Sequence, residues 1–374
     1  MPAATTRRRR RLAVAAVCGL AAGAFACGVA LHDGTSPSPG AASRLTASQL
    51  AGQRIVLGFA GTSPPARVGQ MIRAGQVAGV VLFAENLPSR PAARRLTRRL
   101  QAIPRPPGLH DPLLVMTDQE GGLVRRIGGA PTASARAMGA RGPIFSRDQG
   151  RRTAASLREL GINVDLAPVL DVALPGGTID AADRGFGSSA GGVGATAVPF
   201  AVALQDGGVA ATGKHFPGLG SAQLNTDEAV QRIGLSQGTL RAVDEAPYRR
   251  FVAAGGKMVM LSTAIYPALS PRPAAFSRPI AAGELRKRLG FEGVSITDAL
   301  DTVAVRAFGS GAKVATAAAR AGVDLLLYTD PGEAARAHRA LLRALRSGEL
   351  SRTSFEEAAG RVLRLRHRLP RWAR

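Results

Sequence analysis

The sequence of 374 residues contains little cysteine, histidine or aromatic residue. Its two cysteines, Cys18 and Cys27, both lie within the first thirty residues, so the remaining chain can form neither an internal disulfide nor a thiolate metal site. Its five histidines are not spaced as a cluster of His and acid ligands, which argues against a metal-dependent hydrolase. Aromatic residues make up only 4%, so stacking platforms for nucleic acid are scarce. We therefore predict no metal, no cofactor and no nucleic-acid partner.

Lysine is also rare, although the chain is strongly basic. The formal net charge is +23, and 45 arginines but only 4 lysines supply the positive charge. The arginines are spread along many segments with helical composition and do not form one run. This distribution favours a solvated basic surface over a dedicated site for an anionic polymer. Such a surface would also suit a protein that works near an anionic cell wall.

The N-terminal segment has the pattern of an export signal. A basic cluster, Arg7–Arg11, precedes the uncharged stretch Leu12–Ala30, which has small residues near its end. We predict that residues 1–30 are a signal peptide or a membrane anchor, because the apolar stretch is about as long as a membrane span needs. The sequence around Cys27 weakly resembles a lipoprotein cleavage site. The alternative is that Cys27 is only a small apolar residue of the segment and is not modified. Residues 31–48 are predicted to be a disordered linker. The protein is expected to be exported, either extracellular or anchored to the outer face of the cytoplasmic membrane.

Eight short apolar runs alternate with longer stretches of helical composition. Eight strand–helix units in about three hundred residues are what a (β/α)8 TIM-like barrel requires, so residues 49–374 are predicted to be a single catalytic α/β domain. A doubly wound open sheet is the alternative, but the expected glycine-rich nucleotide fingerprint is missing. The predicted strands are Ile55–Gly61, Gly79–Phe83, Leu113–Thr117, Ile162–Ala167, Val209–Lys214, Met258–Ser262, Val294–Thr297 and Val323–Tyr328. The predicted helices include Asp148–Leu160, Gly194–Gln205, Thr239–Ala254, Glu333–Leu345 and Ser354–Arg368.

Polar residues follow or end most of the predicted strands. Because the carboxyl ends of barrel strands meet at one mouth, where the active sites of such barrels lie, we expect these side chains to converge. A single Asp after a strand is more often a turn residue or a helix cap, but several at one mouth indicate a site. The residues concerned are Asp118, Glu120, Asp165, Asp171, Lys214, His215, Ser262, Thr263, Asp298, Thr329 and Asp330.

Five segments resemble, in the same order, motifs of the family-3 glycoside hydrolases of the β-N-acetylhexosaminidase type. The resemblance covers roughly residues 45–368, and we expect no second domain after it. It implies an exo-acting retaining glycosidase that removes terminal β-linked N-acetylglucosamine from cell-wall fragments or chitin-type oligosaccharides and acts as a monomer. The segments are Asp118–Arg126, Ile162–Val169, Arg184–Gly187, Lys214–Gly218 and Ser295–Leu300.

The resemblance also implies a role for individual residues. Asp298, at the end of a buried strand, would be the nucleophile that forms the glycosyl-enzyme, and an Asp that caps the next helix is the structural alternative. Sugar hydroxyls or the N-acetyl group would be bound by five residues. They are Asp118, Arg126, Arg184, Lys214 and His215. Lys214 is notable because this chain otherwise prefers arginine, and a compact ammonium fits where a planar guanidinium does not.

The sequence departs from the family at the general acid/base. The β-N-acetylglucosaminidase branch has an Asp-x-His pair in the loop after Lys-His-Phe-Pro-Gly, and the corresponding residues here are Asn225, Thr226 and Asp227. Loss of a general acid typically costs about 10²–10⁴-fold in rate.

Three hypotheses remain open at this point. Asp227, or its neighbour Glu228, is itself the acid/base and has a raised pKa. Alternatively, an anionic acceptor such as phosphate takes the sugar from Asp298, as in a glycoside phosphorylase. In the third hypothesis the barrel is catalytically impaired and only binds cell-wall sugars. The preference for glucosaminides over glucosides, as in a β-glucosidase, is not decided by these residues.

Overall fold

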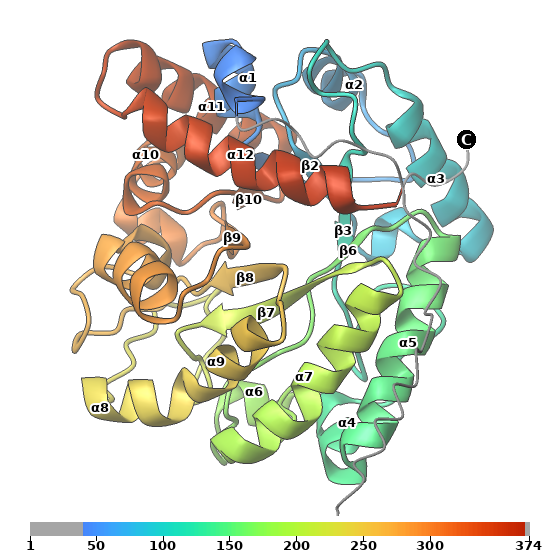
Figure 1. Cartoon of the computed structure of the whole chain (residues 1–374), viewed down its shortest axis with the longest axis vertical. Coiled ribbons are helices and arrows are strands. Elements are labelled where there is room, and N and C mark those ends of the chain that lie inside the picture. The colour runs from blue at the N-terminus through green and yellow to red at the C-terminus, as the bar shows by residue number, and fades with distance from the viewer. Residues whose placement is uncertain (1–39, 371–374) are drawn as a thin grey trace, which may run out of the picture. The chain divides into compact units, whose positions relative to one another are not determined.

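The computed structural model describes residues 40–370, and its centre is a closed barrel of eight parallel strands (Figure 1). The strand order is β10-β1-β2-β3-β6-β7-β8-β9, and a parallel bridge between Ile296 and Leu325 joins the two ends. At this closure the Thr297 N–H donates to the Leu325 carbonyl at 2.9 Å. The predicted (β/α)8 barrel is therefore confirmed. The strands are β1 Ile55–Leu57, β2 Gly79–Val81, β3 Leu114–Thr117, β6 Val164–Asp165, β7 Ala210–Phe216, β8 Met258–Leu261, β9 Val294–Thr297 and β10 Leu326–Tyr328.

The strands are apolar on both faces because each face is covered. Successive side chains of a strand point to opposite sides, so Ile55 and Leu57 pack against the helices whereas Val56 packs inside the barrel. All three are fully buried. Continuous apolar runs, and not alternating ones, are the pattern expected of such parallel strands.

Helices form the outer layer around the strands (Figure 1). Four of the five named helix predictions correspond to α5, α7, α11 and α12. The predicted helix Thr239–Ala254 is divided into α8, the π-helical segment Leu240–Asp244 and α9. The helices are α1 Ala47–Gly52, α2 Ala66–Arg73, α3 Arg90–Ala102, α4 Ala135–Arg141, α5 Pro143–Glu159, α6 Thr178–Ala181, α7 Ala190–Asp206, α8 Gln237–Thr239, α9 Ala246–Ala253, α10 Gly311–Ala321, α11 Pro331–Arg346 and α12 Arg352–Arg368.

The last helix, α12, closes the N-terminal end of the barrel. Its residues Val362 and Leu365, together with the following Leu369, belong to the same apolar cluster as the side chains inside the barrel. Arg366 is almost completely buried and donates to the carbonyls of Pro112, at 2.9 Å, and Asp111, at 2.7 Å. One end of the barrel is thus sealed, and a site can form only at the opposite mouth.

Part of the predicted linker belongs to the folded domain. Residues Ala42–Arg44 form a 3-10 helix and Thr46 caps α1. Leu45 is buried, and Arg352 donates to its carbonyl at 3.2 Å. The prediction of a disordered linker is therefore wrong for this stretch, because Leu45 supplies an apolar contact that composition alone does not reveal.

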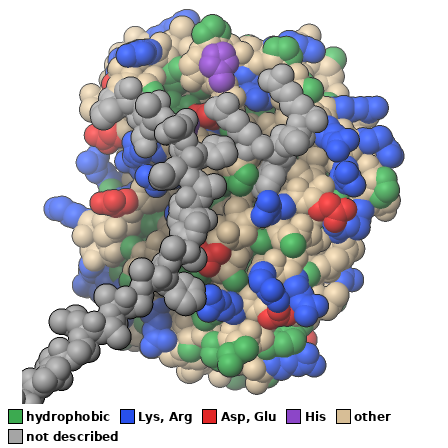
Figure 2. Space-filling view, turned by 45° about the vertical axis from the view of Figure 1, so that its right-hand side comes forward, with side chains coloured by type: hydrophobic (Ala, Val, Ile, Leu, Met, Phe, Trp, Pro, Cys, Tyr) green, Lys and Arg blue, Asp and Glu red, His purple; other side chains and the backbone are tan. Residues whose placement is uncertain are grey.

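The predicted signal or anchor segment, residues 1–30, lies outside the described residues, as do the other residues up to 39. Among residues 40–370, no helix has both the length and the hydropathy that crossing a membrane requires. On the face shown in Figure 2, lysine and arginine side chains are scattered between uncharged ones and do not gather in one patch. This view agrees with the prediction of a solvated basic surface.

Candidate active site

The strands bring separate stretches of the chain to the mouth opposite α12. Asp118 follows β3, Lys214 and His215 lie in the last half of β7, and Asp298 follows β9 directly. After β3 the chain forms a two-stranded hairpin, β4 Gln119–Gly121 and β5 Val124–Arg125, which places Glu120 beside Asp118. Because all eight strands are parallel, these side chains share one mouth, as the sequence predicted.

Lys214 is the centre of a buried ionic cluster. Its Nζ lies 2.7 Å from Asp118 Oδ1 and 2.7 Å from Glu120 Oε1. Arg184 binds both oxygens of Glu120, with Nε–Oε2 at 2.8 Å and Nη2–Oε1 at 2.7 Å. Arg126 lies at the edge, with its Nη2 3.8 Å from Asp118 Oδ2. Four of the five predicted sugar-binding residues therefore meet in one cluster.

The cluster fixes the charge of its members. Burial lowers the pKa of Lys214, but the carboxylates of Asp118 and Glu120 outweigh this effect, so the pKa is raised overall. Burial raises the pKa of Glu120, but the charges of Lys214 and Arg184 and their hydrogen bonds hold it well below its usual range. The side chain of Lys214 is 2% exposed and that of Asp118 is 14% exposed, so Asp118 is the more accessible of these two to a ligand.

His215 is oriented by a buried carboxylate, Asp171. His215 Nδ1 lies 2.7 Å from Asp171 Oδ2, and the backbone N–H groups of His215 and Leu219 donate to Asp171 Oδ1 at 3.1 and 2.8 Å. Asp171 is completely buried. This arrangement holds both the imidazole ring and the turn after β7, and it leaves Nε2 as the ring nitrogen available to a ligand.

Asp227 and Asp298 share the mouth with this cluster. Burial and the negative charge of Asp298 raise the pKa of Asp227 to about 6, whereas the charges of His215 and Arg184 act in the opposite direction. Although the Asp227 side chain is accessible to solvent, protein surrounds it closely enough to disfavour its charge. The Ala304 N–H donates to the Asp227 carbonyl at 3.3 Å, which ties this loop to the one after β9.

Comparison with known proteins identifies the family. Residues 48–365 match the model described as the glycosyl hydrolase family 3 N-terminal domain. The chain belongs to glycosyl hydrolase family 3. It is therefore a glycosidase.

Individual relatives extend over most of the chain. An uncharacterized secreted glycosyl hydrolase of Arthroderma benhamiae is 38% identical over 85% of this chain and 93% of its own length. The β-N-acetylhexosaminidase of Beutenbergia cavernae superposes with a TM-score of 0.80 at 32% identity, covering 85% of this chain and 98% of that one. The family-3 β-N-acetylglucosaminidase of a Paenibacillus species gives 0.82 at 33% identity, over 87% of this chain but only 62% of that longer chain.

The nucleophile candidate of this family-3 barrel has no role as a helix cap. Asp298 accepts a hydrogen bond from the N–H of its own neighbour, Ala299, at 2.8 Å. The next helical segment begins only at Val305, with Ala304 at its cap position. The structural alternative for Asp298 is therefore wrong. Asp330, by contrast, caps α11 through the Glu333 N–H, so this polar strand-end residue serves the fold.

Three buried acids that the sequence placed at the mouth had no predicted role in binding or catalysis. They are Glu120, Asp165 and Asp171. All three lie in or after predicted strands, and this position is the sequence feature that indicated that they belong to the site. Burial raises the pKa of Asp165 well above its usual range, and its only bonded oxygen accepts from the Gln119 N–H at 2.9 Å. Through this bond Asp165 holds the backbone between Asp118 and Glu120.

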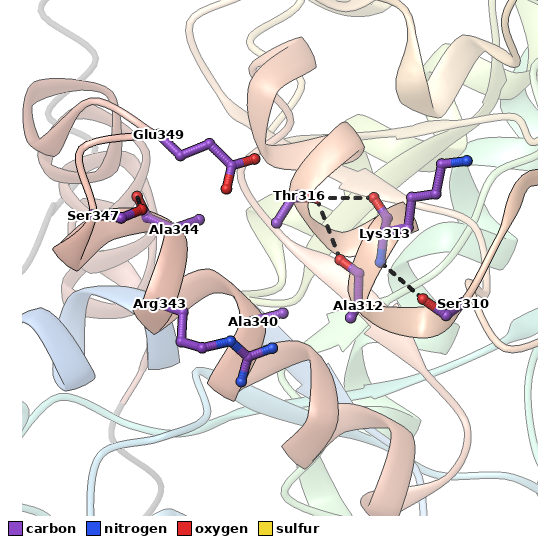
Figure 3. A pocket seen from close by; sticks show the side chains of 9 residues that line it. All are labelled: Ser310, Ala312, Lys313, Thr316, Ala340, Arg343, Ala344, Ser347 and Glu349. Carbon is purple, nitrogen blue, oxygen red and sulfur yellow. Dashed lines mark hydrogen bonds between the residues drawn. The ribbon is translucent and has the colours of Figure 1, made fainter.

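A cavity elsewhere on the domain is not part of this site. A hollow of about 390 Å³ lies between α10 and α11, and Figure 3 shows Lys313, Arg343 and Glu349 around it. None of its lining residues belongs to the ionic cluster. Among residues 40–370, no group of three or more His, Cys, Asp and Glu side chains has the geometry of a metal site.

Proposed function

We propose that this family-3 glycosidase is an exo-acting retaining β-N-acetylhexosaminidase that uses Asp298 as nucleophile and Asp227 as general acid/base. The observation that carries the proposal is that the loop of Asp227 is hydrogen-bonded to the loop that begins with Asp298, through the Ala304 N–H and the Asp227 carbonyl, so that the negative charge of Asp298 helps to raise the pKa of Asp227. A retaining glycosidase needs one ionised and one protonated carboxyl group, and neighbouring charges commonly create this difference. The similarity to a β-N-acetylhexosaminidase and a β-N-acetylglucosaminidase supports the sugar specificity.

The mechanism has two steps. Asp298 attacks the anomeric carbon and forms a glycosyl ester, while Asp227 gives its proton to the glycosidic oxygen of the departing alcohol. Asp227, now ionised, then removes a proton from water, and the resulting hydroxide attacks the anomeric carbon and releases Asp298. The second step restores the proton on Asp227. No further group is needed for the balance of atoms and charge.

The ionic cluster would hold the terminal sugar. Asp118 accepts hydrogen bonds from hydroxyl groups, while Lys214, Arg184 and His215 donate to hydroxyl or N-acetyl oxygens. Arg126 is half-exposed at the edge of the cluster and would contact the same sugar from outside. Because these contacts surround one ring, they favour cleavage of a terminal residue.

The proposal also includes where the protein acts and on which substrates. We infer an exported monomer that acts on cell-wall fragments or chitin-type oligosaccharides, held near the cell by its N-terminus or released from it. A secreted relative that matches 85% of this chain supports export.

The decisive experiment compares hydrolysis of p-nitrophenyl and alkyl β-N-acetylglucosaminides by the wild type and three variants. Asp298→Ala should abolish both activities. Asp227→Ala should lose about 10²–10⁴-fold, and more with the alkyl glycoside because an alcohol is a poorer leaving group. Glu228→Ala, the neighbouring exposed carboxylate, is the matched control and should retain activity. A fluorinated N-acetylglucosaminyl inactivator should label Asp298.

Two outcomes would contradict the proposal. If Asp227→Ala keeps the wild-type rate on the alkyl glycoside, Asp227 has no part in the mechanism. If the wild type cleaves no β-hexosaminide while still binding N-acetylglucosamine, the barrel is a sugar-binding protein.

A further inference from the structure

A second hollow lies at the end of the barrel opposite the mouth. Its volume is about 560 Å³, and it borders Lys257, directly before β8, and Val294, the first residue of β9. On another side it is lined by α12, the helix that seals this end of the barrel. Its volume is that of a typical ligand pocket. The hollow shares no residue with the ionic cluster at the mouth.

The lining of this hollow is strongly basic. Of the described residues that line it, five are cationic and one, Glu292, is acidic. Three of the five come from one side of α12, because residues three, four and seven positions apart lie on the same side of a helix. The cationic residues are Lys257, Arg286, Arg361, Arg364 and Arg368.

Two of the five cations are held by a buried carboxylate. Asp324 is completely buried, accepts a hydrogen bond from Arg361 Nε at 2.9 Å and also pairs with Arg286. Arg286, in the π-helical segment Pro279–Arg288, donates in addition to the carbonyls of Phe291 and Gly293. These bonds fix both guanidinium groups, so the two arginines form a rigid wall of the hollow.

The other three cations have no partner of opposite charge. Among residues 40–370, no ion pair and no side-chain hydrogen bond includes Lys257, Arg364 or Arg368. Arg364 and Arg368 are four residues apart in α12, a spacing at which like charges destabilise a helix. An anion bound between them would remove this repulsion. Cations that line a hollow also produce a stronger field than the scattered cations of the face in Figure 2.

The residue types favour phosphate groups without attached bases. Arginine binds phosphate oxygens in pairs and a lysine ammonium binds them as a point charge, so cations on two walls can hold one tetrahedral group. The bases of a single-stranded nucleic acid need aromatic stacking platforms. The one aromatic residue among the described lining residues is Phe291, which is only 2% exposed. A polymer with phosphodiester groups and no bases therefore fits this hollow best.

We propose that the hollow binds a phosphodiester polyanion, of the class of the polyol phosphates, through Lys257, Arg364 and Arg368. Because the hollow and the mouth lie at opposite ends of the barrel, a bound polymer leaves the mouth open to an oligosaccharide. The site would hold the protein on an anionic polymer while the mouth remains free. This second site goes beyond the proposed glycosidase activity and does not depend on it.

The test measures binding of the full chain to a poly(glycerol phosphate) of defined length by isothermal titration calorimetry. The wild type should bind, and higher salt should weaken the binding because ions screen the charges. Lys257→Gln combined with Arg364→Gln and Arg368→Gln should raise the Kd at least about tenfold, since three charge contacts are lost. Arg364→Gln with Arg368→Gln, both at exposed positions, should raise it by at least about threefold.

The matched control removes the same charge elsewhere. Arg67→Gln, Arg95→Gln and Arg98→Gln change exposed arginines of α2 and α3, which do not line the hollow. This variant should bind the polymer with a Kd within about twofold of the wild type, because distant surface charges are screened. Circular dichroism during heating verifies that each variant is folded.

Four outcomes would overturn the proposal. They are no binding by the wild type, equal weakening in the triple variant and its control, tighter binding of a single-stranded DNA with the same number of phosphates, and tighter binding of a polyglutamate of equal charge. Equal weakening would show that only net charge matters. None of these results bears on the proposed function, because the assay involves no hydrolysis.

Discussion

At the scale of single residues, the site depends on carboxyl groups whose surroundings differ. The charges of Lys214 and Arg184 hold the pKa of Glu120 well below its usual range, whereas burial raises the pKa of Asp165 well above its usual range although Lys214 acts in the opposite direction. Asp227 lies between these extremes, with a pKa of about 6. The same side-chain chemistry can therefore serve to bind a sugar, to support the cluster or to transfer a proton, depending on neighbours that are distant in sequence.

The raised pKa of Asp227 predicts the alkaline limb of the pH profile. The acid must be protonated to assist the leaving group, and above pH of about 6 the protonated fraction falls tenfold per pH unit. We expect kcat/KM for an alkyl β-N-acetylglucosaminide to decline above that pH, and Asp227→Asn to lose most activity together with this limb. A pH–rate profile of both proteins checks this. An unchanged limb in the variant would assign it to another group.

At the scale of secondary-structure elements, close packing of α5 on α7 depends on a missing side chain. A Cβ atom added at Gly150 of α5 would lie 2.3 Å from the Phe200 carbonyl oxygen of α7. The two helices therefore approach each other at a point where only glycine fits. This contact anchors two neighbouring units of the outer layer.

A pair of glycine substitutions tests this packing. Gly150→Ala should destabilise the protein by about 1–3 kcal/mol or more, because the helices must move apart. Gly360→Ala in α12 should stabilise it by up to about 1 kcal/mol, since alanine favours the helix and the nearest atom to the new Cβ is the flexible end of Arg364. Chemical denaturation of both variants provides the measurement. Equal effects of the two substitutions would contradict the packing argument.

At the scale of the whole domain, the last helix, α12, closes one end of the barrel, and the first described segment is bonded to it. Arg352 at the start of α12 donates to the Ser43 and Leu45 carbonyls, and Leu365 packs inside the barrel. The barrel core is therefore complete only when the end of the chain is in place.

Removal of α12 should abolish cooperative folding. A chain that ends at Leu350 exposes the apolar cluster inside the barrel and loses the buried hydrogen bonds of Arg366. We expect this chain to be aggregated or to lack a sharp thermal transition, whereas a chain that ends at Pro370 should melt like the full protein. Circular dichroism during heating distinguishes the two. A cooperative transition in the shorter chain would show that α12 is dispensable.

The sequence by itself determined the barrel, its eight strands and most residues of the mouth, because buried parallel strands require continuous apolar runs and their ends carry the polar residues. It did not reveal that Leu45 is part of the fold, nor that Thr239–Ala254 is interrupted by a π-helical segment. Only the tertiary structure decided that Asp171 orients His215 and that Glu120 joins Lys214 to Arg184. It also decided that Asp227 lies close enough to Asp298 for the negative charge of Asp298 to raise its pKa. The physical reason is that a strand pattern depends on neighbours along the chain, whereas hydrogen bonds and pKa shifts depend on distances between segments that the fold brings together.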